Sequence, residues 1–166
     1  MKNKSINMLI VAFVLIAIFS ITLTVYIFQA REDFDDDITV SESGVTEAIF
    51  KERSLKLVPT EKKELDVNLF CKASGEYHVT IDFIEAADGD MKHFVNVSVL
   101  CNGESVYEGN LAKLLDDPDE KVLFDSELYS KDPTVVTIRY EMPYETGNEA
   151  QGTTADFDVR FTINKK

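Results

Sequence analysis

The sequence predicts an all-β fold: an antiparallel β-sandwich of seven or eight strands, of immunoglobulin-like or jelly-roll-like type, preceded by one N-terminal transmembrane helix. Three observations predict it. Residues 8–28 carry no charge, apolar residues recur at every second position through most of residues 53–166, and turn-forming residues separate these alternating runs. A period of two is typical of strands that bury one face, because successive side chains point to opposite sides of a sheet.

The uncharged run at residues 8–28 predicts a transmembrane helix that acts as a signal-anchor. At 1.5 Å per residue its 21 residues span about 31 Å, the thickness of the hydrocarbon core. Lys2 and Lys4 precede it, so the positive-inside bias keeps residues 1–7 in the cytoplasm. We therefore expect a single-pass protein of the cell membrane that contacts the bilayer through residues 8–28 and has its C-terminal domain outside the cell. A cleaved export signal, which would make the product secreted, is the alternative.

Charge also divides the chain. The whole sequence has 17 Lys and Arg against 30 Asp and Glu, a net charge of −13, and the part beyond the apolar run carries a net charge of −15. Such an acidic protein repels a phosphate backbone, so we expect no nucleic-acid partner.

Residues 29–52 are expected to form an acidic linker or stalk. Six acidic residues lie between Glu32 and Glu42, and repulsion between like charges keeps such a segment extended. Ala48, Ile49 and Phe50 form an apolar patch in this polar stretch. We predict that these three residues are a donor strand, which would add to an open sheet edge of a neighbouring subunit.

The sandwich itself is predicted over residues 53–166. Five strands are recognised by alternating apolar residues, which are Leu65, Val67, Leu69 and Cys71; Tyr77, Val79, Ile81 and Phe83; Val95, Val97, Val99 and Cys101; Val136, Ile138, Tyr140 and Met142; and Ala155, Phe157, Val159, Phe161 and Ile163. Asn102-Gly103 predicts a type I′ hairpin leading into a strand at residues 105–108. A helical turn over residues 111–115 and a short strand at residues 122–124 complete the expected elements.

Two cysteines, Cys71 and Cys101, each end a strand on its apolar face. Outside the cell they either form a disulfide that closes a loop of about 30 residues or remain buried thiols that pack as small apolar groups. The acidic residues Asp116, Asp117, Asp119 and Glu120 offer oxygen ligands for a calcium ion, and a solvated turn is the alternative.

The sequence predicts no catalytic site and no resident cofactor. His78 and His93 fall on the polar positions of their strands, and neither HExxH nor any paired Cys or His motif is present to ligate zinc. No GxSxG sequence offers a nucleophilic serine. We therefore expect a protein that works by contact and is not an enzyme.

Several stretches suggest a family. Residues 57–59 read Leu-Val-Pro, residues 68–75 end a strand with Cys-Lys-Ala-Ser-Gly, and the Asn-Gly turn is followed by Val-Tyr-Glu-Gly-Asn-Leu at 106–111. Residues 141–152 carry Met-Pro followed by Thr-Gly-Asn, before the alternating aromatics of residues 155–161. Over residues 55–166 this pattern resembles the TasA and camelysin family of bacterial cell-surface and biofilm-matrix proteins.

The resemblance implies a β-sandwich exported through a dedicated signal peptidase and an extracellular structural or adhesive role. We therefore expect a membrane-anchored structural or interaction protein of a matrix or envelope assembly, with self-association or other surface proteins as its contacts. The alternatives are a camelysin-like surface metallopeptidase and a ligand- or glycan-binding surface module. The resemblance brings no zinc ligands with it, because this sequence lacks a zinc motif.

Overall fold

The computed structural model describes residues 35–41 and 45–166. The predicted cytoplasmic segment at residues 1–7, the predicted transmembrane helix at residues 8–28 and the start of the predicted stalk lie outside the described residues. Among the residues that the structure describes, no helix is long and apolar enough to cross a membrane.

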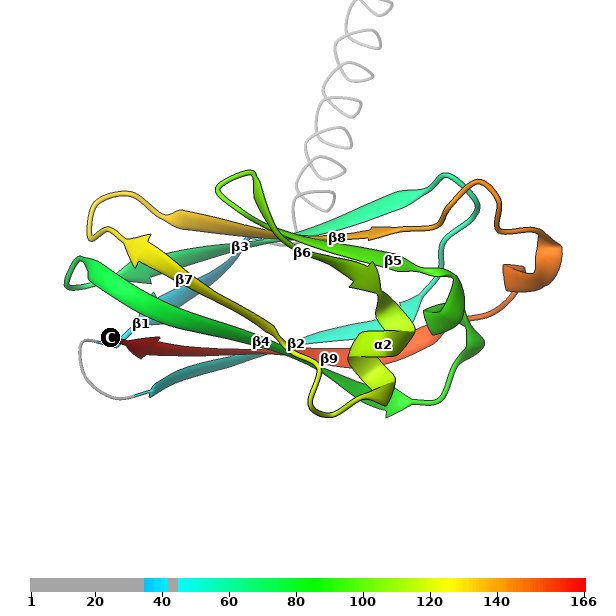
Figure 1. Ribbon diagram of the computed structural model, residues 1–166, viewed down its shortest axis with the longest axis horizontal. Helices are drawn as coiled ribbons and strands as arrows, with labels where there is room; N and C mark the ends of the chain where they lie inside the picture. Colours follow the sequence, from blue (N-terminus) through cyan, green and yellow to red (C-terminus); the bar gives the residue numbers. More distant parts are fainter. Residues whose placement is uncertain (1–34, 42–44) are drawn as a thin grey trace, which may run out of the picture. The chain divides into compact units, whose positions relative to one another are not determined.

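The described residues form nine strands in two layered sheets (Figure 1). The five-stranded sheet has the order β1-β3-β8-β5-β6 and the four-stranded sheet the order β2-β9-β4-β7. The strands are β1 (Asp35–Val40), β2 (Val45–Leu55), β3 (Lys62–Cys71), β4 (Gly75–Ala87), β5 (Asn96–Cys101), β6 (Glu104–Asn110), β7 (Val122–Leu128), β8 (Thr134–Glu141) and β9 (Ala155–Lys165). The short helices are η1 (Asp90–Phe94), α2 (Leu111–Asp116) and η2 (Asn148–Ala150). The predicted all-β, two-sheet class is confirmed.

The core lies between the two sheets and consists largely of the predicted alternating residues. On β3, β4, β8 and β9 these side chains are buried and their neighbours face outward, as the period of two requires. The ring of Phe157 on β9 lies 5.6 Å from Tyr140 on β8 and 6.1 Å from Phe83 on β4. The contact between Phe157 and Tyr140 joins the four-stranded sheet to the five-stranded one, whereas that between Phe157 and Phe83 lies within the four-stranded sheet.

The predicted turn chemistry is confirmed at the hairpin between β5 and β6. Asn102 has a φ of 49° and Gly103 a φ of 85°, the two left-handed positions of a type I′ turn. Asn102 also holds the hairpin to the neighbouring strand β8, because its N–H donates to Val135 O (2.8 Å) and its Oδ1 accepts from Val135 N (2.9 Å).

The predicted helical turn is confirmed as α2. Asn110 caps its first turn, since its Oδ1 accepts a hydrogen bond from Ala112 N at 2.9 Å. Leu111 and Leu114 are buried beneath the helix. Six residues are enough because packing of these two leucines, and not helix propensity, stabilises so short an element.

Two strands occupy positions that the sequence analysis assigned to the acidic stalk. β1 buries Ile38 and Val40, and β2 pairs antiparallel with β9, with Val45 opposite Asn164 and Glu52 opposite Phe157. The stalk interpretation is therefore wrong for residues 35–40 and 45–52, and the sandwich begins before residue 53. The acidic composition concealed these strands because only every second side chain of a strand must be apolar.

Candidate interaction edges

Among the residues that the structure describes, strand β2 pairs only with β9 and so lies at the edge of the four-stranded sheet. Phe50 points inward, and its ring lies 5.5 Å from that of Phe161 in an edge-to-face contact. Ile49 points outward and is 51% exposed, as is Val45 at 58%. An edge strand has unpaired backbone N–H and C=O groups, and here it also presents apolar side chains to water.

The regular part of β2 ends at Glu52. The pairing with β9 shifts register between Glu52 and Leu55, and Ser54 has a φ of 54°. Glu52 is an inward-facing carboxylate at only 2% exposure, and its Oε2 accepts a hydrogen bond from Lys63 Nζ at 2.7 Å. Lys63 lies on β3, so this ion pair joins the edge strand to the other sheet. An inward-pointing charge and a bulge both limit how far strand pairing can extend along an edge.

Strand β7 forms the opposite edge of the same sheet. Its exposed apolar residue Leu123 is followed by the acidic residues Asp125 and Glu127 on the same outward side. Asp125 Oδ2 accepts from Lys166 Nζ at 2.6 Å, and its Oδ1 lies 2.9 Å from His78 Nδ1. The hydrogen bond from Lys166, followed by that from His78, lowers the pKa of Asp125. The edge at β7 is therefore predominantly acidic.

The predicted donor segment lies within β2. Ala48 is opposite Phe161, Ile49 opposite Arg160 and Phe50 opposite Val159, all on the chain's own strand β9. Donation to another copy would first break these pairs, whereas addition of a strand at the free side of β2 keeps them.

Cys71 and Cys101 are free thiols in this structure; Cys71 is buried, as the second predicted alternative requires, whereas Cys101 is half-buried. They end β3 and β5, which lie on opposite sides of β8. Two interstrand spacings place their Cα atoms at least about 9 Å apart, beyond the reach of a disulfide. Burial is the largest effect on Cys71 and raises the pKa of its thiol. Cys101 Sγ lies 3.6 Å from Ser126 Oγ.

The predicted calcium ligands are directed to separate partners. Asp116 Oδ1 lies 2.8 Å from Lys92 Nζ, Glu120 Oε1 lies 2.6 Å from Lys113 Nζ, and Asp117 Oδ1 accepts from Asp119 N at 3.0 Å. The acidic residues therefore do not converge on one point, because nearby lysines and the backbone bind them individually. Across residues 35–41 and 45–166, no group of three or more His, Cys, Asp or Glu is arranged to hold a metal ion.

One charged cluster, formed by the buried Lys92 and three carboxylates, was not predicted from the sequence. The side chain of Lys92 in η1 is only 8% exposed, and its Nζ lies 2.6 Å from Glu85 Oε1, 2.8 Å from Asp116 Oδ1 and 3.4 Å from Asp88 Oδ1. The spacing of Asp88 and Lys92 is the only local signal. Glu85 and Asp116 are brought in by the packing of β4 and α2, which no pattern in the sequence reports.

A pocket of about 360 Å³ lies where residues 56–61 meet residues 150–153. Its walls are mainly apolar and include Leu57, Val58, Pro59, Met91 and Ala150. Two of its polar lining residues have backbone partners, since Glu61 Oε2 accepts from Val58 N and Thr153 Oγ1 donates to Ala150 O.

Comparisons with known proteins assign no family to the chain. No model of a protein family matches it, and no curated protein matches it. The chain is similar to PliG, a periplasmic inhibitor of g-type lysozyme from Aeromonas hydrophila, at 12% identity and a TM-score of 0.36, covering 80% of this chain and 99% of that one.

Two larger solved structures are also similar to the chain in part. A β-glucosidase from Paenibacillus barengoltzii has 15% identity and a TM-score of 0.31, covering 76% of this chain and 11% of that one. The insecticidal δ-endotoxin Cry8Ea1 from Bacillus thuringiensis has 12% identity and a TM-score of 0.33, covering 65% and 18%. The chain thus spans about a tenth of the glucosidase and less than a fifth of the endotoxin.

Proposed function

We propose that this chain is a membrane-anchored extracellular structural or interaction protein that self-associates through an edge of its sandwich. In this proposal residues 8–28 form a single transmembrane helix, residues 1–7 stay in the cytoplasm, and a sandwich of immunoglobulin-like or jelly-roll-like type stands outside the cell. The role is that of a component of a matrix or envelope assembly, in keeping with the resemblance to TasA-type proteins.

One observation carries the proposal: the edge strand β2 exposes Val45 and Ile49 on its outer side. Unpaired backbone groups beside exposed apolar side chains favour addition of another strand, because pairing satisfies the backbone and removes the apolar surface from water. The acidic Glu47 and the basic Lys51 alternate with these residues. Such a strand is suited to a specific contact, and its charges keep it soluble until it is paired.

Sedimentation of the full-length protein in detergent micelles, over a range of protein concentrations, tests the proposal. We expect a concentration-dependent increase in mass for the natural chain and its loss in Ile49→Lys. Val58→Lys is the matched control, because Val58 is 62% exposed but lies in the loop between β2 and β3, outside the paired strands. Equal association of both variants would contradict the role of the edge, and a monomer at all concentrations would contradict the proposed function.

Membrane topology is tested separately in cells. We expect a cysteine-specific, membrane-impermeant reagent to label Tyr144→Cys, whose natural side chain is 80% exposed, above the background from Cys71 and Cys101, and to label Asn3→Cys no more than the natural chain. The intact mass of the protein from the membrane fraction should include residues 1–28. A mass that lacks these residues would indicate that they are a cleaved signal and not an anchor.

A further inference from the structure

We propose that two copies of the chain pair through β2, antiparallel about a two-fold axis at Ile49, so that two four-stranded sheets become one sheet of eight strands. The inference rests on the proposed function, since it names the partner and the register of the same edge. It is carried by the self-complementary pattern of β2.

The outward side chains of β2 supply the charge complementarity. Val45, Glu47, Ile49 and Lys51 are all exposed and occupy alternate positions on one side of the sheet. When Ile49 of one copy lies opposite Ile49 of the other, Glu47 lies opposite Lys51 of the partner copy, and Lys51 opposite its Glu47. Two ion pairs then flank a central apolar pair. Directly opposed residues of an antiparallel pair are close enough for both kinds of contact to form.

The inward side chains fit the same register. Ala48 falls opposite Phe50 of the other copy on both sides of the axis, so a small side chain meets a large one. Both are half-buried in the single chain. Phe50 is already positioned against Phe161 at 5.5 Å, so little side-chain freedom is lost when the second copy covers it.

The backbone allows this register from Thr46 to Glu52, within the regular part of the strand. Pairing centred on Ile49 aligns Thr46 with Glu52, and the ladder of β2 to β9 is regular from Val45 to Glu52. β2 keeps its own hydrogen bonds to β9, because the second copy adds at the opposite side. Two-fold symmetry makes the contact closed, which yields a dimer and not an open fibre.

The other edge of the sheet does not offer the same contact. On β7 the outward positions after Leu123 are Asp125 and Glu127. An antiparallel pair of β7 strands would place these carboxylates beside each other, and like charges that face across strands are destabilising. We therefore expect two copies to pair through β2 and not through β7.

Disulfide trapping of the full-length protein in its membrane tests the register. In a β2 dimer the two Cα atoms at position 49 lie about 4.5–5.5 Å apart, which is within disulfide range. Those at position 47 lie about 13 Å apart, because each is opposite residue 51 of the partner. Under mild oxidation we expect Ile49→Cys to form cross-linked dimer at least about tenfold faster than Glu47→Cys. A mixture of Glu47→Cys and Lys51→Cys chains should cross-link to each other.

Charge reversal provides an independent test that does not require a disulfide. Glu47→Lys or Lys51→Glu alone opposes like charges at two positions, and we expect each to weaken association by about tenfold. The double variant Glu47→Lys/Lys51→Glu restores opposite charges and should recover the natural affinity. Natural Cys71 and Cys101 remain in every variant, with the unmodified chain as the background for cross-linking.

The outcomes separate the two proposals. If the natural chain self-associates but Ile49→Cys cross-links no faster than Glu47→Cys, or the double charge reversal fails to recover affinity, the β2 register is wrong and the proposed function stands. If the natural chain stays monomeric at all concentrations, both are wrong.

Discussion

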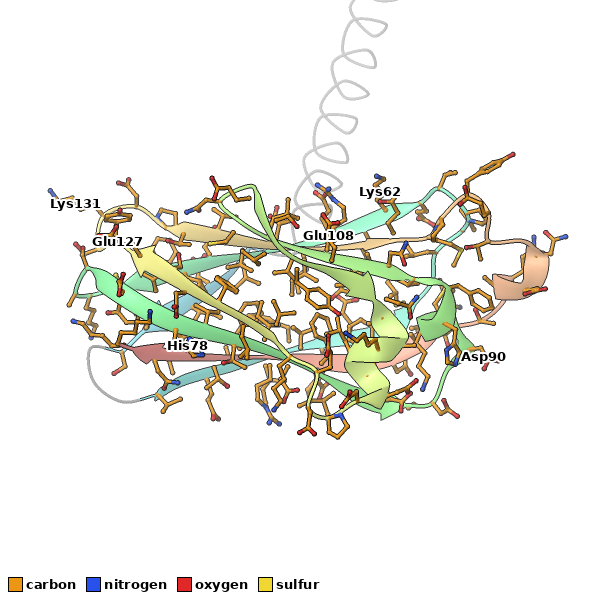
Figure 2. All side chains as sticks on the ribbon, viewed as in Figure 1. Lys62, His78, Asp90, Glu108, Glu127 and Lys131 are labelled. Atoms are coloured by element: carbon orange, nitrogen blue, oxygen red, sulfur yellow. The ribbon has the colours of Figure 1, made fainter. Side chains whose placement is uncertain are left out.

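The ammonium group of Lys92 lies 2.6 Å from Oε1 of Glu85 at a position where the lysine side chain is only 8% exposed. Asp116 binds the same ammonium at 2.8 Å. Because Glu85 lies near the end of β4, Lys92 belongs to η1 and Asp116 ends α2, one buried charge joins three separate elements. Figure 2 shows Asp90, the first residue of η1, at this end of the sandwich.

We predict that Lys92→Met destabilises the fold by about 1–3 kcal/mol. Two carboxylates would lose their buried counter-charge, which costs more than the loss of an exposed pair, although their own partial exposure reduces the penalty. Urea unfolding followed by tyrosine fluorescence measures the effect, since the chain has no tryptophan. Lys113→Met, which removes an exposed pair with Glu120, is the control and should change little. Equal effects would contradict the buried role of Lys92.

The same cluster predicts a dependence on alkaline pH. Hydrogen bonds to Asp116 and then Glu85 raise the pKa of Lys92. A lysine with a raised pKa in the folded state stabilises the fold fully below its unfolded pKa, about 10.4, and the contribution is lost as the pH rises through the folded value. The stability difference between the natural chain and Lys92→Met should be constant from pH 7 to about 10 and shrink above it. A difference that shrinks instead below pH 9 would contradict this assignment.

Gly89→Ala should destabilise the fold by about 2–3 kcal/mol. A Cβ at position 89 would lie 2.1 Å from the carbonyl oxygen of Thr154, and that neighbour is backbone, so it cannot rotate away. Gly147→Ala is the matched control, because a Cβ there meets nothing within 4 Å and the φ of −71° suits alanine. Thermal unfolding of the two variants compares them, and similar midpoints would show that residues 88–90 can move away from residue 154.

Tyr140→Phe should either leave the free energy of unfolding unchanged or increase it by up to about 1 kcal/mol. The Tyr140 hydroxyl is buried and has no hydrogen-bond partner among the described residues, and desolvation with the nearby Glu52 charge raises its pKa well above the usual value. Tyr77→Phe is the opposite case, since its hydroxyl donates to Ala73 O at 2.7 Å, and we expect a loss of about 1 kcal/mol. Denaturant titration of both variants checks the sign. Destabilisation by Tyr140→Phe would indicate a bound water or other partner.

Removal of Lys166 should raise the pKa of Asp125 towards its ordinary value. The hydrogen bond from Lys166 is the largest cause of the lowered pKa, and that from His78 is the second. Any stability that Asp125 contributes is therefore present above its unfolded pKa and is lost as the pH falls through the lowered one. The carboxyl carbon shift of Asp125, followed by NMR during acid titration, measures this in Lys166→Ala and His78→Ala. We expect a larger rise in Lys166→Ala, and the reverse order would contradict the assignment.

Much of the sandwich was predictable from local pattern. The alternation of Phe157, Val159 and Phe161 with Asp158 and Arg160 indicates a strand with one buried face, because period two is a property of a single extended segment. The Asn102-Gly103 hairpin was predictable for the same reason, since both positive φ values lie within two adjacent residues.

β2 was not predictable in this way. Val45 and Ile49 face outward while Ala48 and Phe50 face inward, so its apolar residues do not alternate cleanly. The backbone of an edge strand forms hydrogen bonds with only one neighbouring strand. On β2, apolar side chains lie on both faces. The Lys92 cluster was not predictable either, because Glu85 and Asp116 lie 31 positions apart in the sequence and come together only through packing.

The sequence by itself determined which segments are extended, where the chain turns and which side of most strands is apolar, since these depend on neighbours along the chain. Only the tertiary structure decided which strands pair, that β2 and β7 are left at the edges of the four-stranded sheet, and which carboxylates meet Lys92. Those relationships depend on contacts between residues far apart in the chain, and the separation of two residues in the sequence does not determine their distance in space.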